Sequence, residues 1–495
     1  MLTKESKITN YRNLLLSGLF ISSILIRIIT AEYVDIGGDN SAKWLWAKHL
    51  AEGIPIDHWY QQTVRWPILF PLAGMIKTFG YNPVQMYILP VLFSSLATLM
   101  ICLIGERLHS LRLGLTAAAL TMLFPQMAQT GSQLWPGVFE MGYISTCIWL
   151  LLCWADSKSL PLLLLAACVF FLGWGSRVTV IYAFPGLALL IWLPSKNFRA
   201  LATFSLTIGL LCGIEWGCFW LLSGNPMGRL GILKSTHIVT AGLDISLIDY
   251  VLNFKKLIKL RGLIPIWVLC MGASIWTTRS KDPRWRAVGW FYIIYSLLLL
   301  YMISSISPLK LAMPVGTRFW GVVAPVGLLI LLWSLSNLGS SRPKTAKSLT
   351  VILFTVFTLF TLKKIPPINS LVQTHRDYQL LQPILAAKQP VLMEYQHWQP
   401  NLIEEFVISN ITGQKGKRIP REDHVQMAII RNHGRMASLF VNESPKVIEF
   451  KNKELLSRIG YTVYRFNPPG SDSNISPAAK ILFGRKLHSA TRLSH

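Results

Sequence analysis

Long apolar stretches recur through the first 362 residues, separated mostly by short polar connections. A helix needs about 20 largely apolar residues to cross a bilayer, and about eleven stretches approach that length. They cover residues 13–32, 84–104, 112–126, 137–154, 160–174, 177–193, 200–222, 262–278, 287–304, 318–337 and 348–362. The sequence therefore predicts an all-α polytopic membrane protein with about eleven transmembrane helices.

The charged residues indicate an orientation. They make up only 14% of the chain, against about a quarter in soluble domains, and the formal net charge is +25. With the N-terminus inside, the inside connections are short and basic, as in ERLHSLR (106–112) and SSRPKTAK (340–347). One exception is FKKLIKLR (254–261), which falls in a long outer loop. This basic charge favours contact with the lipid bilayer rather than nucleic acid, because no soluble module carries a basic stripe with stacking aromatic residues.

The polar C-terminal region predicts a separate domain. An odd number of spans places residues 363–495 outside, after a transmembrane domain of residues 1–362. Three segments favour strands and two favour helices. The strands are expected at 390–395, 446–450 and 461–466, and the helices at about 400–409 and 422–433. All seven cysteines lie in or beside apolar stretches, so the expected small extracytoplasmic α/β domain has no disulfide framework.

The first outer loop, residues 33–83, holds the densest polar side chains. Asp35 and Asp39 flank Gly37-Gly38, and a segment rich in tryptophan follows. Residues 40–52 favour a helix lying in the membrane surface, with tryptophans in the headgroup layer. Residues 66–80 contain two prolines and predict a second interfacial or re-entrant helix. Asp39 is the first candidate for a general base, although the same carboxylate suits a helix N-cap, and Asp35 is the second.

Other ionisable residues are further candidates. Glu140 lies in an apolar stretch near its outer end, where an acid is costly unless it is paired or hydrated, so it has either a functional role or a local partner. Three arginines at outer ends suit a phosphate, although snorkelling to headgroups is the alternative. They are Arg65, Arg177 and Arg318. Two loop lysines suit a lipid phosphate or a solvated surface, and one histidine suits a structural role. These are Lys255, Lys256 and His58.

Several segments together resemble a known superfamily. The loop reads DNSAKWLWAKHLAEG (39–53) and then RWPILFPLAGMIKTFG (65–80). Glu140, the stretch LGWGSRVTVIYAFPGLALLIWL (172–193) and the stretch GTRFWGVVAPVGLLILL (316–332) extend the pattern. This arrangement, over roughly residues 10–340, resembles GT-C membrane glycosyltransferases. It looks closest to the branch of protein O-mannosyltransferases and lipid A aminoarabinose transferases. Protein mannosyltransferases carry an Asp-Glu pair in this loop, whereas Asn40 follows Asp39 here, which leaves the acceptor open.

The resemblance implies a hexosyl- or pentosyltransferase that uses a polyprenyl-phosphate sugar and inverts the anomeric carbon. It implies that Asp39 activates the acceptor, that Glu140 lines the same cavity, and that Arg318, Arg177 and Arg65 face the donor phosphate. The absence of a Gly-rich nucleotide loop agrees with a lipid-linked donor. We therefore expect a glycosyltransferase on the periplasmic face of a bacterial inner membrane. Its expected acceptor is O-antigen or another surface glycan, and lipid A core and protein are the next candidates. Participation of a divalent metal ion stays open.

Three alternatives remain. An O-antigen polymerase or ligase would depend on arginine- and histidine-rich outer loops rather than on an acidic first loop. A lipid-linked sugar flippase or transporter would carry mid-span polar residues and repeated halves, and the sequence shows little of either. A non-catalytic envelope scaffold would tolerate asparagine at Asp39.

Overall fold

The computed structural model describes the helical part of the chain and three short C-terminal strands. The described residues are 4–32, 39–56, 59, 61–80, 82, 84–236, 246–253, 263–306, 309–311, 321–341, 343–363, 365–366, 369–372, 391–393, 427–431 and 461–465. The chain divides into two compact units, unit 1 with residues 1–33 and 46–371, and unit 2 with residues 34–45 and 372–495.

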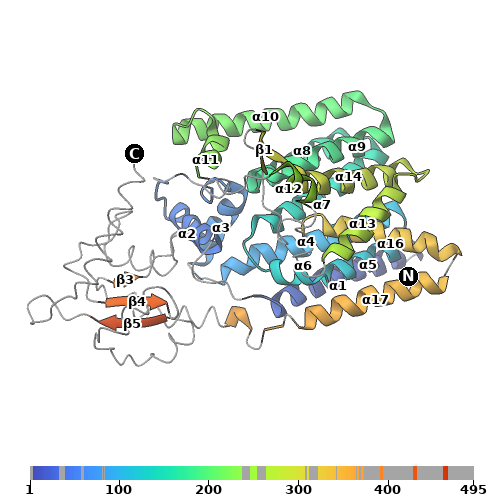
Figure 1. The fold of residues 1–495 in the computed structure, drawn as a ribbon, viewed down its shortest axis with the longest axis horizontal. Helices are drawn as coiled ribbons and strands as arrows, with labels where there is room; N and C mark the ends of the chain where they lie inside the picture. The colour runs from blue at the N-terminus through green and yellow to red at the C-terminus, as the bar shows by residue number, and fades with distance from the viewer. Residues whose placement is uncertain are drawn as a thin grey trace, which may run out of the picture. The chain divides into compact units, whose positions relative to one another are not determined.

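Unit 1 is a bundle of helices (Figure 1). Its helices are α1 (Lys4–Ile29), α3 (Trp66–Phe79), α4 (Gln85–Leu108), α5 (Leu111–Met122), α6 (Pro125–Thr130), α7 (Pro136–Ser157), α8 (Leu160–Ser176), the 3-10 helix η1 (Val178–Ala183), α9 (Phe184–Ser195), α10 (Phe198–Ser223), α11 (Gly228–Thr236), α12 (Leu247–Val251), α13 (Leu263–Thr277), α14 (Pro283–Tyr301), α16 (Ala324–Ser341) and α17 (Pro343–Leu362). The strands β1 (Ile303–Ile306) and β2 (Leu309–Leu311) form an antiparallel pair after α14.

Each predicted apolar stretch is helical over most of its length. In the described part of the chain, six segments are long and apolar enough to cross a membrane. They are Thr9–Ile29, Gln85–Leu108, Pro136–Ser157, Val178–Ser195, Phe198–Ser223 and Pro343–Leu362. Five other apolar helices are shorter than this. The chain is thus a mostly helical protein with several candidate spans, and a total of eleven crossings stays a prediction.

Local sequence explains where many helices begin. Proline occupies the first turn of α6, α7 and α14, where its missing N–H has no helical partner to lose. Elsewhere a polar side chain caps the helix, as when Asn197 accepts a hydrogen bond from the Ala200 N–H at 3.1 Å. These signals place helix ends without reference to the tertiary fold.

Three expectations need correction. The stretch 112–126 is not one helix, because α5 ends at Met122 and Pro125 starts the separate helix α6. The prediction of a helix at 422–433 is wrong, because residues 427–431 form a strand. The stretch 287–304 ends early, since β1 begins at Ile303. At 427–431, four consecutive apolar residues suit a strand that is paired on both edges.

Unit 2 contains a three-stranded sheet of β3 (Val391–Met393), β4 (Met427–Arg431) and β5 (Tyr461–Arg465). The central strand β4 pairs in parallel with β3 and antiparallel with β5. The strands predicted within 390–395 and 461–466 are confirmed. The segments expected at 446–450 and 400–409 lie outside the described residues, and the extent of a domain over 363–495 stays a prediction.

Helix α2 (Asp39–Ala51) confirms the helix predicted after the first acidic pair. Gly53, with a φ of 68°, follows its end, and Pro55 prevents its continuation. Trp46 and Ala47 are buried, so this end of α2 packs into the protein. The Trp46 indole is therefore covered by protein, and a position of α2 in the membrane surface stays a prediction.

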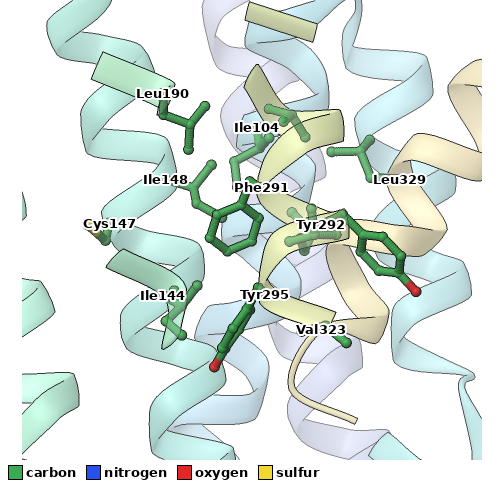
Figure 2. Close-up of a cluster of buried hydrophobic side chains, with 14 of the residues drawn as sticks. Ile104, Ile144, Cys147, Ile148, Leu190, Phe291, Tyr292, Tyr295, Val323 and Leu329 are labelled. Atoms are coloured by element: carbon green, nitrogen blue, oxygen red, sulfur yellow. The ribbon is translucent and has the colours of Figure 1, made fainter. Parts of the chain in front are cut away.

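The core of unit 1 lies where α4, α7, α9 and α14 pack together. Phe291, Tyr292 and Tyr295 extend from α14 among aliphatic side chains such as Ile144 and Ile148 of α7 (Figure 2). All three aromatic residues are fully buried. By contrast α10 and α17, at opposite edges of the bundle in Figure 1, bury little of their surface. A long apolar helix exposed in this way suits contact with lipid.

Helices α4 and α5 cross at two glycines, which carries our first prediction. A Cβ on Gly105 would lie 2.7 Å from the Gly114 Cα, and a Cβ on Gly114 would overlap the Cys102 carbonyl oxygen. Gly114→Ala is therefore expected to lower the free energy of unfolding by about 1–3 kcal/mol, measured by equilibrium unfolding in detergent micelles. The matched control is Gly209→Ala on α10, where an added Cβ meets nothing within 4 Å. Equal stability of the two variants would contradict this close crossing.

Candidate active site

Two buried carboxylates gather polar side chains at one end of the unit 1 bundle. Helix α7 begins at this end, whereas α8, α10 and α14 finish there, because successive packed helices alternate in direction. Helix α3 begins there too, since Trp66 contacts the end of α10. In the orientation predicted from the sequence this is the outer end, where the acidic first loop is expected.

The first group, here the Glu140 cluster, contains Glu140, Arg177, Thr179 and Tyr295. The Glu140 Oε2 accepts a hydrogen bond from the Arg177 Nη1 at 2.7 Å. Its Oε1 accepts from the Thr179 Oγ1 at 2.7 Å and from the Tyr295 hydroxyl at 2.6 Å. The carboxylate therefore joins α7, η1 and α14 through three charge-assisted bonds.

The two charged side chains of the Glu140 cluster differ in their exposure to solvent. The Glu140 side chain is 0% exposed, whereas the Arg177 side chain is 10% exposed. Figure 2 shows the Tyr295 hydroxyl at the edge of the apolar core, beyond the ring that packs near Ile144. Both Glu140 oxygens already accept hydrogen bonds, so this geometry favours a carboxylate that orients Arg177 and Tyr295. A proton acceptor would need a free oxygen facing the substrate.

The second group, here the Glu215 cluster, contains Trp66, Trp174, Glu215 and Arg229. The Trp66 Nε1 donates to the Glu215 Oε1, and the Trp174 Nε1 donates to the Oε2, both at 2.7 Å. The Arg229 Nη1 lies 3.2 Å from the Oε1 and 3.4 Å from the Oε2. Its Nη2 donates to the Trp174 carbonyl at 2.8 Å, and its guanidinium lies over the Trp174 ring at 5.3 Å.

The Glu215 cluster places a buried ion pair at this end of the bundle. Burial lowers the pKa of the Arg229 guanidinium from its ordinary value, while the Glu215 carboxylate opposes that shift by raising it. Four segments meet here: the start of α3, the end of α8, α10 and α11. The first loop is thereby held to the long loop after α10.

One stretch, residues 174–179, contributes hydrogen-bonding side chains to both clusters. Trp174 binds Glu215, and Arg177 and Thr179 bind Glu140. Gly175, between them, allows close packing, because an added Cβ would lie 2.7 Å from the Pro67 Cγ and 2.9 Å from the Trp66 ring. This stretch is part of 172–193, one of the segments that carried the sequence resemblance.

The structure brings together two of the predicted site residues, Glu140 and Arg177. Arg65 precedes α3, is partly exposed, and donates from Nε to the Gln61 carbonyl at 3.0 Å. Asp39 is the first residue of α2. The remaining candidates lie outside the described residues. They are Asp35, His58, Lys255, Lys256 and Arg318. Among the residues that are described, no three His, Cys, Asp or Glu side chains are grouped as they would be around a metal ion.

Sequence reasoning missed several members of these clusters. Glu215 carried the same signal as Glu140, since it is an acid within an apolar stretch. The same signal applied to Arg27 in α1, which is fully buried and donates to the Met122 carbonyl at 3.0 Å. The sequence around Thr179, Tyr295 and Arg229 did not indicate a site, because these polar groups are paired with Glu140 or Glu215 only in the folded chain.

Comparisons with known proteins give the fold. No protein-family model matches the sequence, and no curated protein matches it. ArnT from Cupriavidus metallidurans bound to undecaprenyl phosphate superimposes with a TM-score of 0.57, at 11% identity, over 91% of this chain and 97% of that chain. The same protein in the apo state gives 0.55, at 12% identity, over 93% and 98%.

A third neighbour is more distant. The archaeal oligosaccharyltransferase AglB from Archaeoglobus fulgidus, in complex with an inhibitory peptide and a dolichol-phosphate, has a TM-score of 0.43 at 11% identity. It matches over 84% of this chain and 69% of that chain. By the two ArnT superpositions, the chain has the fold of that protein.

Proposed function

We propose that this chain transfers a sugar from a polyprenyl-phosphate donor to an acceptor of the cell envelope. The observation that carries the proposal is the match along almost the full length of both chains to ArnT, which was solved with undecaprenyl phosphate bound. Several apolar helices agree with a site beside lipid, where a prenyl tail would lie. The reaction takes place on the periplasmic face of a bacterial inner membrane.

The proposed reaction is a single inverting displacement. An acceptor hydroxyl or amine attacks the anomeric carbon, and Asp39 takes the proton that the nucleophile loses. The bond between the anomeric carbon and the phosphate oxygen breaks, and the polyprenyl phosphate leaves with the electron pair. Asp35 is the alternative base. The acceptor is O-antigen or another surface glycan, with lipid A core or protein as further candidates.

Arginine side chains stabilise the departing phosphate in this proposal. A guanidinium stays charged and can donate two parallel hydrogen bonds to phosphate oxygens. Arg177 is suited to this role because Glu140 holds one edge of its fork while part of the side chain stays exposed. Arg65 and Arg318 are the other candidates for contact with the phosphate, and His58, Lys255 and Lys256 are further candidates for binding the substrate. Glu140 is here a positioning residue.

Asp39→Asn carries the second prediction and tests the function. Loss of a general base is expected to lower transfer about a hundred- to ten-thousand-fold. The measurement is sugar incorporation into envelope glycans of a deletion strain that expresses wild type or variant. A second measurement is release of polyprenyl phosphate by the purified chain in lipid nanodiscs supplied with lipid-linked sugars.

Asp35→Asn is the comparison variant, since it removes the alternative base from the same loop; loss of transfer in Asp35→Asn but not in Asp39→Asn would assign the base to Asp35. Wild-type transfer by Asp39→Asn, at equal protein amount, would remove Asp39 from the mechanism. If the wild type itself transfers no sugar and the deletion shortens glycan chains instead, the polymerase or ligase alternative replaces this proposal. Accumulation of lipid-linked sugar on the cytoplasmic side would favour the flippase alternative.

A further inference from the structure

Two helices of unit 1 end in the same sequence pattern and the same backbone shape. Helix α7 ends with Trp154-Ala-Asp-Ser-Lys158, and α9 ends with Trp192-Leu-Pro-Ser-Lys196. Lys158 has φ 53° and ψ 21°, and Lys196 has φ 52° and ψ 22°. In the part of the chain that the structure describes, these lysines are the two non-glycine residues with positive φ.

The hydrogen bonds of the two turns also correspond. The N–H of each lysine donates to the carbonyl of its tryptophan, at 2.7 Å for Lys158 and 2.8 Å for Lys196. In each turn the serine hydroxyl donates to the carbonyl one helical turn earlier, at 3.0 Å for Ser157 and 2.6 Å for Ser195. The two caps are therefore one structural motif used twice.

Helix α10 ends in a related cap that lacks the lysine. Its sequence is Trp220-Leu-Leu-Ser-Gly224, and Gly224 has φ 69° and ψ 0°. Glycine is the ordinary residue for this left-handed position, because a Cβ is disfavoured there. The glycine cap lies at the opposite end of the bundle from the two lysine caps, since α10 starts where α7 and α9 finish. A lysine in a position that favours glycine points to a use for its ammonium group.

Each ammonium group lies over an aromatic ring. The Lys158 Nζ is 4.8 Å from the centre of the Trp154 ring, and the Lys196 Nζ is 5.5 Å from the centre of the Trp192 ring. Both lysines are exposed. Among the described residues neither has a carboxylate within ion-pair distance. The ring restricts each ammonium and leaves its outer side for an anion.

The carboxylates at this end of the bundle are already paired with arginines. Glu106 binds Arg12 at 2.7 Å, and Asp156 binds Arg107 at 2.8 Å and Arg284 at 3.4 Å. Their negative charge is thereby largely neutralised. The two exposed lysines therefore lie in a region of net positive charge.

We propose that the lysine–tryptophan caps at Lys158 and Lys196 are binding sites for the phosphate of anionic lipid headgroups. The ligand is a phospholipid with net negative charge in the leaflet at the end of the bundle where α7 and α9 finish. The Trp154 ring is buried and the Trp192 ring is partly buried, so the protein holds each indole in place beneath its ammonium group. The caps would hold these two helix ends at a fixed depth in the membrane, independently of the sugar-transfer reaction.

The test compares the thermal unfolding midpoint of the full chain in two kinds of nanodisc. One is made of phosphatidylcholine, and the other of an equimolar mixture of phosphatidylcholine and phosphatidylglycerol. We expect a higher midpoint for the wild type in the mixture. We expect Lys158→Asn/Lys196→Asn to lose more than half of that difference, because asparagine tolerates the left-handed backbone and carries no charge.

The matched control is Lys344→Asn/Lys347→Asn, which removes the same charge from exposed positions on α17 at the same end. It should keep most of the difference. An equal loss in both double variants would overturn the proposal, and so would an unchanged difference in the cap variant. If the asparagine variant folds poorly, Lys158→Gly/Lys196→Gly replaces it, since glycine relieves the backbone. Inorganic phosphate added to phosphatidylcholine nanodiscs should not reproduce the shift; if it does, the sites bind soluble anions instead.

Discussion

Replacing Glu140 with alanine is expected to lower the free energy of unfolding by about 3–5 kcal/mol, the usual cost of breaking a buried ion pair by removing one partner. The change removes the carboxylate that accepts hydrogen bonds from the Arg177 guanidinium and from the Thr179 and Tyr295 hydroxyls. Glu140 is 0% exposed, so water does not readily replace the lost carboxylate. Equilibrium unfolding in detergent micelles would measure the effect.

A double variant separates the two roles of the pair. Glu140→Leu/Arg177→Met removes both charges and should recover most of the lost stability, because a buried pair is often no more stable than an apolar replacement. Its sugar transfer should nevertheless stay low if Arg177 contacts the donor phosphate. Recovery of both stability and transfer would limit the pair to a structural role. A cost below about 1 kcal/mol for Glu140→Ala would mean that the Glu140 cluster does not form.

Glu215→Ala is expected to have a comparable effect, about 3–5 kcal/mol. It removes the acceptor of the Trp66 and Trp174 indole N–H groups and leaves Arg229, which is 3% exposed, with an uncompensated charge. Since the cluster joins α3 and α11 to α8 and α10, amide hydrogen exchange should rise in α3 and α11 but much less in α7. Mass-spectrometric exchange on the purified chain would measure this distribution.

Two variants control for this prediction. Trp66→Phe keeps the aromatic ring and removes one N–H, so we expect about 1.5–3 kcal/mol, the value of a hydrogen bond to a charged group. Trp216→Phe changes the neighbouring residue, which is 46% exposed and donates to the Pro226 carbonyl at 3.1 Å, and should cost under about 1 kcal/mol. If Glu215→Ala costs no more than Trp216→Phe, the carboxylate does not hold these segments together.

The secondary structure of unit 1 was largely predictable from the sequence. Apolar stretches of near-membrane length became helices, and proline or a polar cap marked many of their starts. Of the two main failures, one has a local cause, since Pro125 divides the stretch 112–126. The other does not, since residues 427–431 form a strand by pairing with two strands that are distant in the sequence. Hydrophobic length and backbone chemistry act within a few residues, so they can be read without the fold.

The candidate site was predictable only in part. Glu140 and Arg177 were each recognisable, because an acid within an apolar stretch and an arginine at its outer end are unusual. Their pairing across 37 positions was not predictable, nor was the bond from Tyr295 to Glu140 across 155 positions. Glu215 was overlooked although it carried the same signal as Glu140.

By itself, the sequence determined that this chain forms apolar helices, where most of them begin and end, and which family its outer segments resemble. Only the tertiary structure decided that α3, α8, α10 and α11 meet at Glu215, and that α7, η1 and α14 meet at Glu140. The physical reason is the range of the forces. Helix formation depends on residues four apart, whereas a buried charge needs partners that helix packing brings from distant parts of the chain.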